Sequence, residues 1–175
     1  MKRRQAQLVA LLALALSGCW FGNGLFADSD ARAVLEPGVY RFTEPGKAAH
    51  DVTISILPSG LTKLNDPESD DGDATYGLVP VPGSSGRILG WFTKDGTPTS
   101  EQTQLYFLGE KQGDGFAFFV PGCEGSDGQI ATTAGAEVEG GSGRSCRFTN
   151  KASVLKAIAQ VKPNEDDRLV LTRKR

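Results

Sequence analysis

Few side chains in this chain of 175 residues could do chemistry, since it holds one histidine and three cysteines. A Ser-His-Asp hydrolase would need His50 as its general base, together with a serine on a strained turn. No G-x-S-x-G motif supplies that serine. His50 stands beside Asp51 at the start of an alternating segment, where a solvated side chain is the simpler interpretation. We therefore expect no catalytic residue and no enzymatic activity.

The acidic segment 66–73 is a second place where chemistry could occur. Carboxylates two residues apart in this segment resemble the start of the calcium-binding loop of EF-hand proteins. However, Gly72 falls one position late, Gly77 stands where that loop needs glutamate, and no helical pattern flanks the segment. Clustered acids prefer water, which favours a solvated hairpin tip. Zinc would also lack ligands. The expectation is therefore no metal and no cofactor.

The first residues have the order of an export signal. A cationic start, Met1-Lys2-Arg3-Arg4, is followed by an apolar run over residues 8–16, shorter than the roughly 20 residues that a membrane-spanning helix needs. The next four residues, Leu16-Ser17-Gly18-Cys19, resemble the lipobox of bacterial lipoprotein precursors. The resemblance implies that residues 1–18 are a signal peptide and that lipid on Cys19, including palmitate, anchors the protein. An uncleaved signal anchor and an ordinary signal peptide are the alternatives.

The same resemblance implies a location in the bacterial cell envelope. Trp20 follows the cysteine, where an aspartate would favour retention at the inner membrane. The outer membrane, facing the periplasm, is therefore favoured over the inner membrane. The formal net charge is −2, with no basic stripe that could neutralise phosphates, so nucleic acid is not an expected partner.

If Cys19 carries lipid, Cys123 and Cys146 remain, and an even number of cysteines in an oxidising compartment indicates a disulfide. The bond would close a glycine-rich loop, whose ordering is costly in entropy, and would stabilise the fold by about 3 kcal/mol. A redox-active or metal-binding pair is the alternative, although the spacing is not C-x-x-C.

The remaining pattern predicts a tether over residues 19–34 and a single β-rich domain over residues 35–175. Apolar residues alternate with polar ones between glycine, proline and aspartate turns, which is typical of antiparallel strands. Strands are expected at residues 39–42, 51–56, 61–64, 76–79, 87–93, 103–108, 115–120 and 168–172. One late helix is expected over residues 151–161, capped by Thr149 or Asn150. The fold class is mainly β, an antiparallel small barrel or sandwich with this late C-terminal helix.

Aromatic side chains concentrate on the central strands, and both faces of those strands are apolar. Either the sheet is covered on both sides or one face lines a hydrophobic pocket, with Trp91, Tyr106, Phe116 and Phe118 as possible ligand-facing residues. An ordinary packed core is the simpler alternative. The segment Gly38-Val39-Tyr40 resembles the glycine-x-tryptophan opening of lipocalins, with tyrosine in place of tryptophan.

Two functions follow from these patterns. The first is a non-catalytic interaction or structural module that presents its disulfide-closed loop, residues 123–146, to another envelope protein. The second is a lipocalin-like carrier or sensor of small hydrophobic ligands, which the aromatic strands indicate.

Overall fold

The computed structural model describes residues 18–69, 73–93, 101–140, 144–164 and 167–174, and the chain is mostly β. Its strands are β1 (Trp20–Asn23), β2 (Gly38–Thr43), β3 (His50–Ile56), β4 (Thr62–Asn65), β5 (Ala74–Pro80), β6 (Arg87–Thr93), β7 (Thr103–Gln112), β8 (Gly115–Phe119), β9 (Glu137–Glu139), β10 (Ser145–Phe148) and β11 (Leu169–Arg173). A 3₁₀ turn, η1 (Asp28–Asp30), and two helices, α2 (Gly125–Thr133) and α3 (Lys151–Ile158), complete the described elements.

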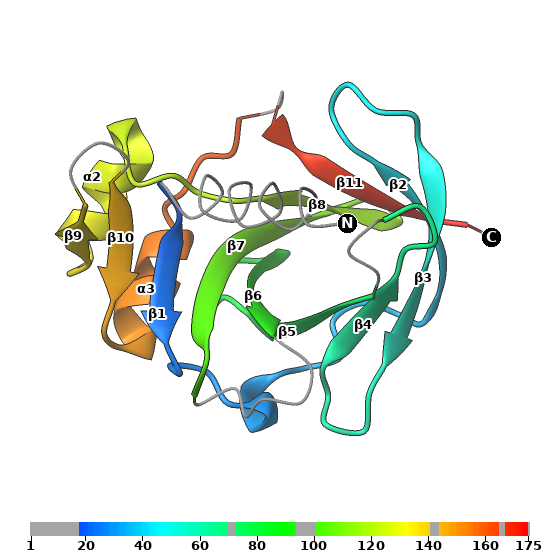
Figure 1. The fold of residues 1–175 in the computed structure, drawn as a ribbon, viewed down its shortest axis with the longest axis horizontal. Helices are drawn as coiled ribbons and strands as arrows, with labels where there is room; N and C mark the ends of the chain where they lie inside the picture. Colours follow the sequence, from blue (N-terminus) through cyan, green and yellow to red (C-terminus); the bar gives the residue numbers. More distant parts are fainter. Residues whose placement is uncertain (1–17, 70–72, 94–100, 141–143, 165–166, 175) are drawn as a thin grey trace, which may run out of the picture.

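Eight of the strands form a closed antiparallel barrel (Figure 1). The order is β6-β5-β4-β3-β2-β11-β8-β7, and β6 pairs again with β7 to close the ring. Of the two architectures expected from the sequence, the barrel is the one that forms. Closure leaves none of these eight strands with a free edge along the ring.

The strand β3 shows how the alternation in the sequence builds the wall. Val52 and Ile54 are almost fully buried in the barrel interior, whereas Thr53 and Ser55 are exposed. The following turn over residues 57–61 reverses the chain through Gly60, whose φ of +88° suits glycine. The amide of Leu57 then donates to the carbonyl of Leu61 at 2.8 Å, which starts the pairing with β4.

A second layer lies beside the barrel, at the left of Figure 1. It consists of β1, β10, β9 and the two helices, and β1 joins it to the barrel by pairing antiparallel with β7 and parallel with β10. The chain therefore has two cores, one inside the barrel and one between the barrel wall and the helices.

The strands β6 and β7 are buried on both faces because they separate the two cores. Leu89 and Trp91 point into the outer core, whereas Ile88, one residue away, belongs to the barrel interior. Tyr106 and Phe107 divide in the same way. The observation that both faces of these strands are apolar thus has a structural reason.

The late helix begins at Lys151, as the sequence predicts, and ends at Ile158, three residues before the predicted end. The Asn150 side chain caps it by accepting a hydrogen bond from the Ser153 amide at 2.9 Å. Val154, Ala157 and Ile158 are fully buried in the outer core. At the other end the Arg87 guanidinium donates to the carbonyl of Ala159 at 2.7 Å, which satisfies a helix-terminal acceptor.

The expectation of a tether over residues 19–34 is wrong for this structure. Trp20 is fully buried and donates its indole N–H to the carbonyl of Gly122 at 2.7 Å. Phe26 stacks on Trp91, with ring centroids 4.8 Å apart. The buried Gln104 amide binds both backbone groups of Phe26, accepting from its N–H at 3.0 Å and donating to its carbonyl at 2.6 Å. Folded structure therefore begins immediately after Cys19.

The segment 123–146 is also more ordered than a glycine-rich loop. Cys123 and Cys146 form the expected disulfide, which joins the start of α2 to β10. Ala131 of α2 is fully buried in the outer core. A Cβ at Gly128 would overlap the carbonyl of Cys123, so this helix can approach the bridge only with glycine there. Residues 141–143 lie outside the described part of the chain.

Candidate functional site: a cavity inside the barrel

The interior of the barrel is not filled at one end. A cavity of about 230 Å³ lies there, and most of its lining is apolar. Its lining residues come from the eight strands of the barrel and from the segments that adjoin them. Phe92 and Val120 line it and are still 39% and 41% exposed, which places the opening to solvent beside them. An apolar cavity of about 150 Å³ is already large enough to hold benzene.

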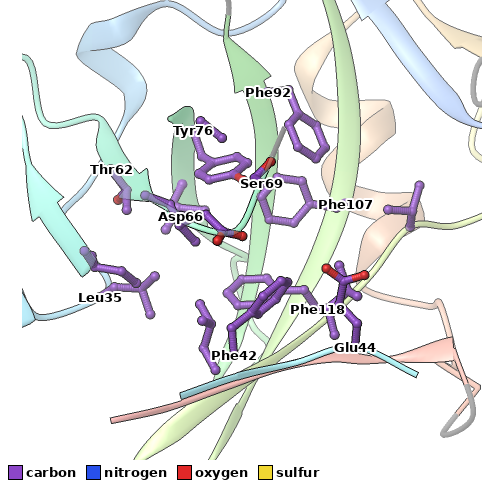
Figure 2. Close-up of a pocket in the computed structure, with 17 residues that line it drawn as sticks. Leu35, Phe42, Glu44, Thr62, Asp66, Ser69, Tyr76, Phe92, Phe107 and Phe118 are labelled. Carbon is purple, nitrogen blue, oxygen red and sulfur yellow. The ribbon is translucent and has the colours of Figure 1, made fainter. Parts of the chain in front are cut away.

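Aromatic rings form much of the wall, and Figure 2 shows them around a common space. Tyr76, Phe92 and Phe107 contact one another edge to face, with ring centroids 5.1 to 5.7 Å apart. Phe118 joins this group through Phe107, at 5.7 Å. Phe42 lines the cavity from β2. Contacts of this kind hold rings in fixed orientations, so the wall is largely preformed.

A glycine on the neighbouring strand determines how the Phe107 ring lies. Gly90 on β6 is paired with Phe107 on β7, and a Cβ at Gly90 would overlap that ring. Gly77 on β5 has the same relation to Trp91 on the outer face of the wall. Each ring therefore lies over a glycine of the adjacent strand, and Phe107 leaves room for the cavity.

The polar groups of the cavity are few. Glu44, Asp66 and Ser69 line it, and Figure 2 shows the Asp66 carboxylate turned toward the space between the rings. Thr62 adds a buried hydroxyl that meets no hydrogen-bond partner in the described part of the chain. A mostly apolar wall with a small number of placed polar groups is typical of small-molecule sites.

The side chains of His50 and Asp66 contact each other beside the cavity. The imidazole Nε2 lies 3.0 Å from Asp66 Oδ1, and the two side chains are only 11% and 10% exposed. Asp66 also accepts from the Glu68 amide at 2.9 Å, which fixes the turn after β4. The hydrogen bond from Asp66 raises the pKa of His50, against the opposing effect of burial. Burial, followed by the Asp66 charge, raises the pKa of Tyr76 to about 12.

The four aromatic residues expected to face a ligand are divided between the two cores. Phe118 lines the cavity, and Phe116 packs against the same interior cluster without lining it. Trp91 and Tyr106 are fully buried in the outer core, so for these two the expectation is wrong for this cavity. Alternation places residues on opposite faces of a strand, but it does not say which face is the interior when both are apolar.

The residues that the sequence reasoning missed are Phe42, Tyr76, Phe92 and Phe107. Phe92 and Phe107 have the opposite parity to Trp91 and Tyr106 on the same strands, so reversing the choice of face would have found them. Phe42 could have been found because it lies two residues after Tyr40 and therefore on the same face of that strand. Tyr76 lies three residues after the acidic segment 66–73, and no pattern in the sequence connects that segment with the cavity.

The acidic segment itself divides between two roles. Asp66 belongs to the cavity, whereas Asp73 forms an ion pair with Lys63 at 2.6 Å on the outside. Residues 70–72 lie outside the described part. Within the described residues, no group of three or more histidine, cysteine or acidic side chains could hold a metal ion.

Cys19, the expected lipidation site, is half-buried and forms an isolated β-bridge with Gly122. Burial raises the pKa of its thiol. Except for Gly18, the expected signal peptide lies outside the described residues. Among the helices that the structure describes, none combines the length and the apolar character needed to cross a membrane.

Comparison of the chain with models of known protein families, with curated proteins and with solved structures gives no match.

Proposed function

We propose that this protein is a lipid-anchored envelope protein that holds a small hydrophobic ligand inside its barrel. The observation that carries the proposal is the aromatic cavity of about 230 Å³ with its opening beside Phe92 and Val120. A packed core of ordinary density contains few voids larger than a water molecule. Maintaining this cavity leaves apolar surface unpacked, which costs stability, and binding of a ligand offsets that cost.

The arrangement of the two cores supports a carrier. The outer core, with its helices and disulfide, stabilises one side of the barrel wall. The core inside the barrel leaves space at the open end. A ligand can therefore enter without unfolding the second layer. The segment 123–146, on which the expectation of an interaction module depended, contributes Ala131 and Cys146 to the outer core. The lipid anchor stays part of the proposal on the strength of the lipobox-like segment ending at Cys19.

The proposal is tested by filling the cavity. The mature chain carrying Cys19→Ser, exported with an ordinary cleavable signal peptide, avoids detergent that would compete for the cavity. Titration with 3-phenylpropanol in a calorimeter is expected to show one site with a dissociation constant on the order of 0.1 mM, from about ten non-hydrogen atoms at roughly 0.5 kcal/mol each. Ala74→Trp adds an indole to the lining and should abolish the binding.

The matched control is Thr53→Trp, which adds the same side chain to the exposed face of β3. This variant should bind as the parent does. If the parent does not bind the probe, or if Ala74→Trp binds as well as Thr53→Trp, the barrel is not the binding site and the proposal is wrong.

A further inference from the structure

The charges that face the cavity are of one sign. Among the described residues that line it, the only charged side chains are the carboxylates of Glu44 and Asp66, and none is lysine, arginine or histidine. Figure 2 shows the Asp66 carboxylate below Tyr76, toward the space between the rings, and Glu44 beside Phe118. A carboxylate or phosphate ligand would therefore meet like charge at the open end and no cation among the described residues of the wall.

The cations near these carboxylates lie outside the lining. Lys47 pairs with Glu44 at 2.6 Å, but its side chain is 69% exposed, and an exposed pair of this kind contributes little and exchanges readily with water. His50 approaches Asp66 at 3.0 Å, while the carboxylate of Glu68 lies 3.9 Å from the other ring nitrogen. Near the open end there are thus three carboxylates, those of Glu44, Asp66 and Glu68. The cations beside them are one exposed lysine and one imidazole.

The rings add to the same preference. The faces of aromatic rings carry partial negative charge, and they attract cations within about 6 Å of the ring centroid. Tyr76, Phe107 and Phe118 surround the space into which Asp66 points. A cation that leaves water for this site would meet aromatic rings and carboxylate oxygens together, which compensates part of its lost hydration.

From this arrangement we propose that the ligand is a small organic cation, with its apolar part among the aromatic rings and its ammonium group beside Asp66 and Glu44. The inference rests on the proposed function, since it names the ligand class of the same cavity. Fatty acids and other apolar anions are the class that this lining excludes.

Three probes with the same phenylpropyl body separate the charge of the ligand from its apolar part. The chain carrying Cys19→Ser is titrated at neutral pH and low salt with 3-phenylpropylammonium, 3-phenylpropanol and 3-phenylpropionate. The ammonium is expected to bind about tenfold more tightly than the alcohol, the effect of one cation–π contact and one partly shielded ion contact. The carboxylate should bind most weakly.

Charge-neutral variants assign the effect to the two carboxylates. Asp66→Asn and Glu44→Gln should each weaken ammonium binding several-fold and weaken alcohol binding much less. Retained alcohol binding also shows that the barrel is folded. Glu36→Gln is the matched control, because Glu36 is paired with Arg173 and does not line the cavity. It should change neither affinity.

The outcomes distinguish this inference from the proposed function. Equal or tighter binding of the alcohol or the carboxylate overturns the cation preference and leaves the cavity as a ligand site. Ammonium binding that survives both Asp66→Asn and Glu44→Gln also overturns it. Failure of all three probes to bind would reject the proposed function itself.

Discussion

Cys19→Ser, exported with an ordinary cleavable signal peptide in place of residues 1–18, is expected to move the protein completely from the membrane fraction to the soluble fraction. A single acyl chain gives only marginal membrane binding, whereas the two or three chains of a bacterial lipoprotein anchor it almost irreversibly. Folding should not change, since Cys19 is half-buried and serine preserves its size and backbone bridge to Gly122. Sedimentation of membranes, together with labelling by an alkyne analogue of palmitate, measures both effects.

The control keeps the native signal and removes the disulfide by substituting Cys123 and Cys146 with serine. That protein should stay in the membrane fraction and take up the label. If Cys19→Ser still sediments with membranes, or if the native chain takes up no label, the lipobox interpretation is wrong.

The structure adds a geometric consequence to this anchor. Trp20 follows Cys19 directly and is locked into the outer core, so no flexible residues separate the lipid from the folded chain. A lipid on Cys19 would therefore hold the domain against the bilayer surface, with β1 and the segment around Gly122 nearest to it.

Removal of the disulfide is expected to lower the free energy of unfolding by about 3 kcal/mol, from the entropy that the bridge takes from the unfolded chain. Cys146 is fully buried on β10 beside Trp20, and Cys123 precedes a helix that contains two glycines. This helix depends on the bridge because its own helix propensity is low. Denaturant unfolding of Cys123→Ser, Cys146→Ser and the double variant, all in the Cys19→Ser background, measures the loss.

The double variant should be little less stable than either single variant, as expected for two residues that act through one bond. Reduction of the parent should reproduce the loss, and reduction of the double variant should have no effect. Clear additivity of the two single variants would mean that the cysteines do not stabilise the fold through a shared bond.

Most of the barrel could be predicted from the sequence because its strands alternate and are separated by turn residues. The strand β3, with Val52 and Ile54 facing inward and exposed Thr53 between them, is the clearest case. The helix α3 could be predicted equally well, from its Asn150 cap and from the apolar residues of its buried face. In each case the local signal and the tertiary environment agree.

Apart from α3, the second layer could not be predicted because its elements depend on distant partners. The strand β1 has four residues, and it forms only by pairing with β7 and β10, which lie far along the chain. Its Trp20 indole donates to the carbonyl of Gly122, which is equally distant in the sequence. The helix α2 begins at a glycine and has little apolar periodicity, and it forms against a disulfide that closes only when the chain has folded.

The candidate site could be predicted only as one of two alternatives. Aromatic residues on adjacent strands were compatible with a hydrophobic pocket and with an ordinary packed core, and the sequence did not say which face was inside. That choice depends on the second layer, which covers Trp91 and Tyr106 and so makes Phe107 and Phe118 the interior residues. The contribution of Asp66 depends on the turn after β4, where its own hydrogen bonds bring it to the open end.

The most direct measurement is a native intact mass of the protein extracted gently from its own membranes, without reductant, beside the Ala74→Trp variant prepared in the same way. We predict acyl mass on a chain that begins at Cys19, a deficit of two hydrogens for the disulfide, and a stoichiometric small molecule on the parent that the variant lacks. The same bound mass on both proteins, or no bound mass on either, would contradict the carrier and direct attention to a protein partner.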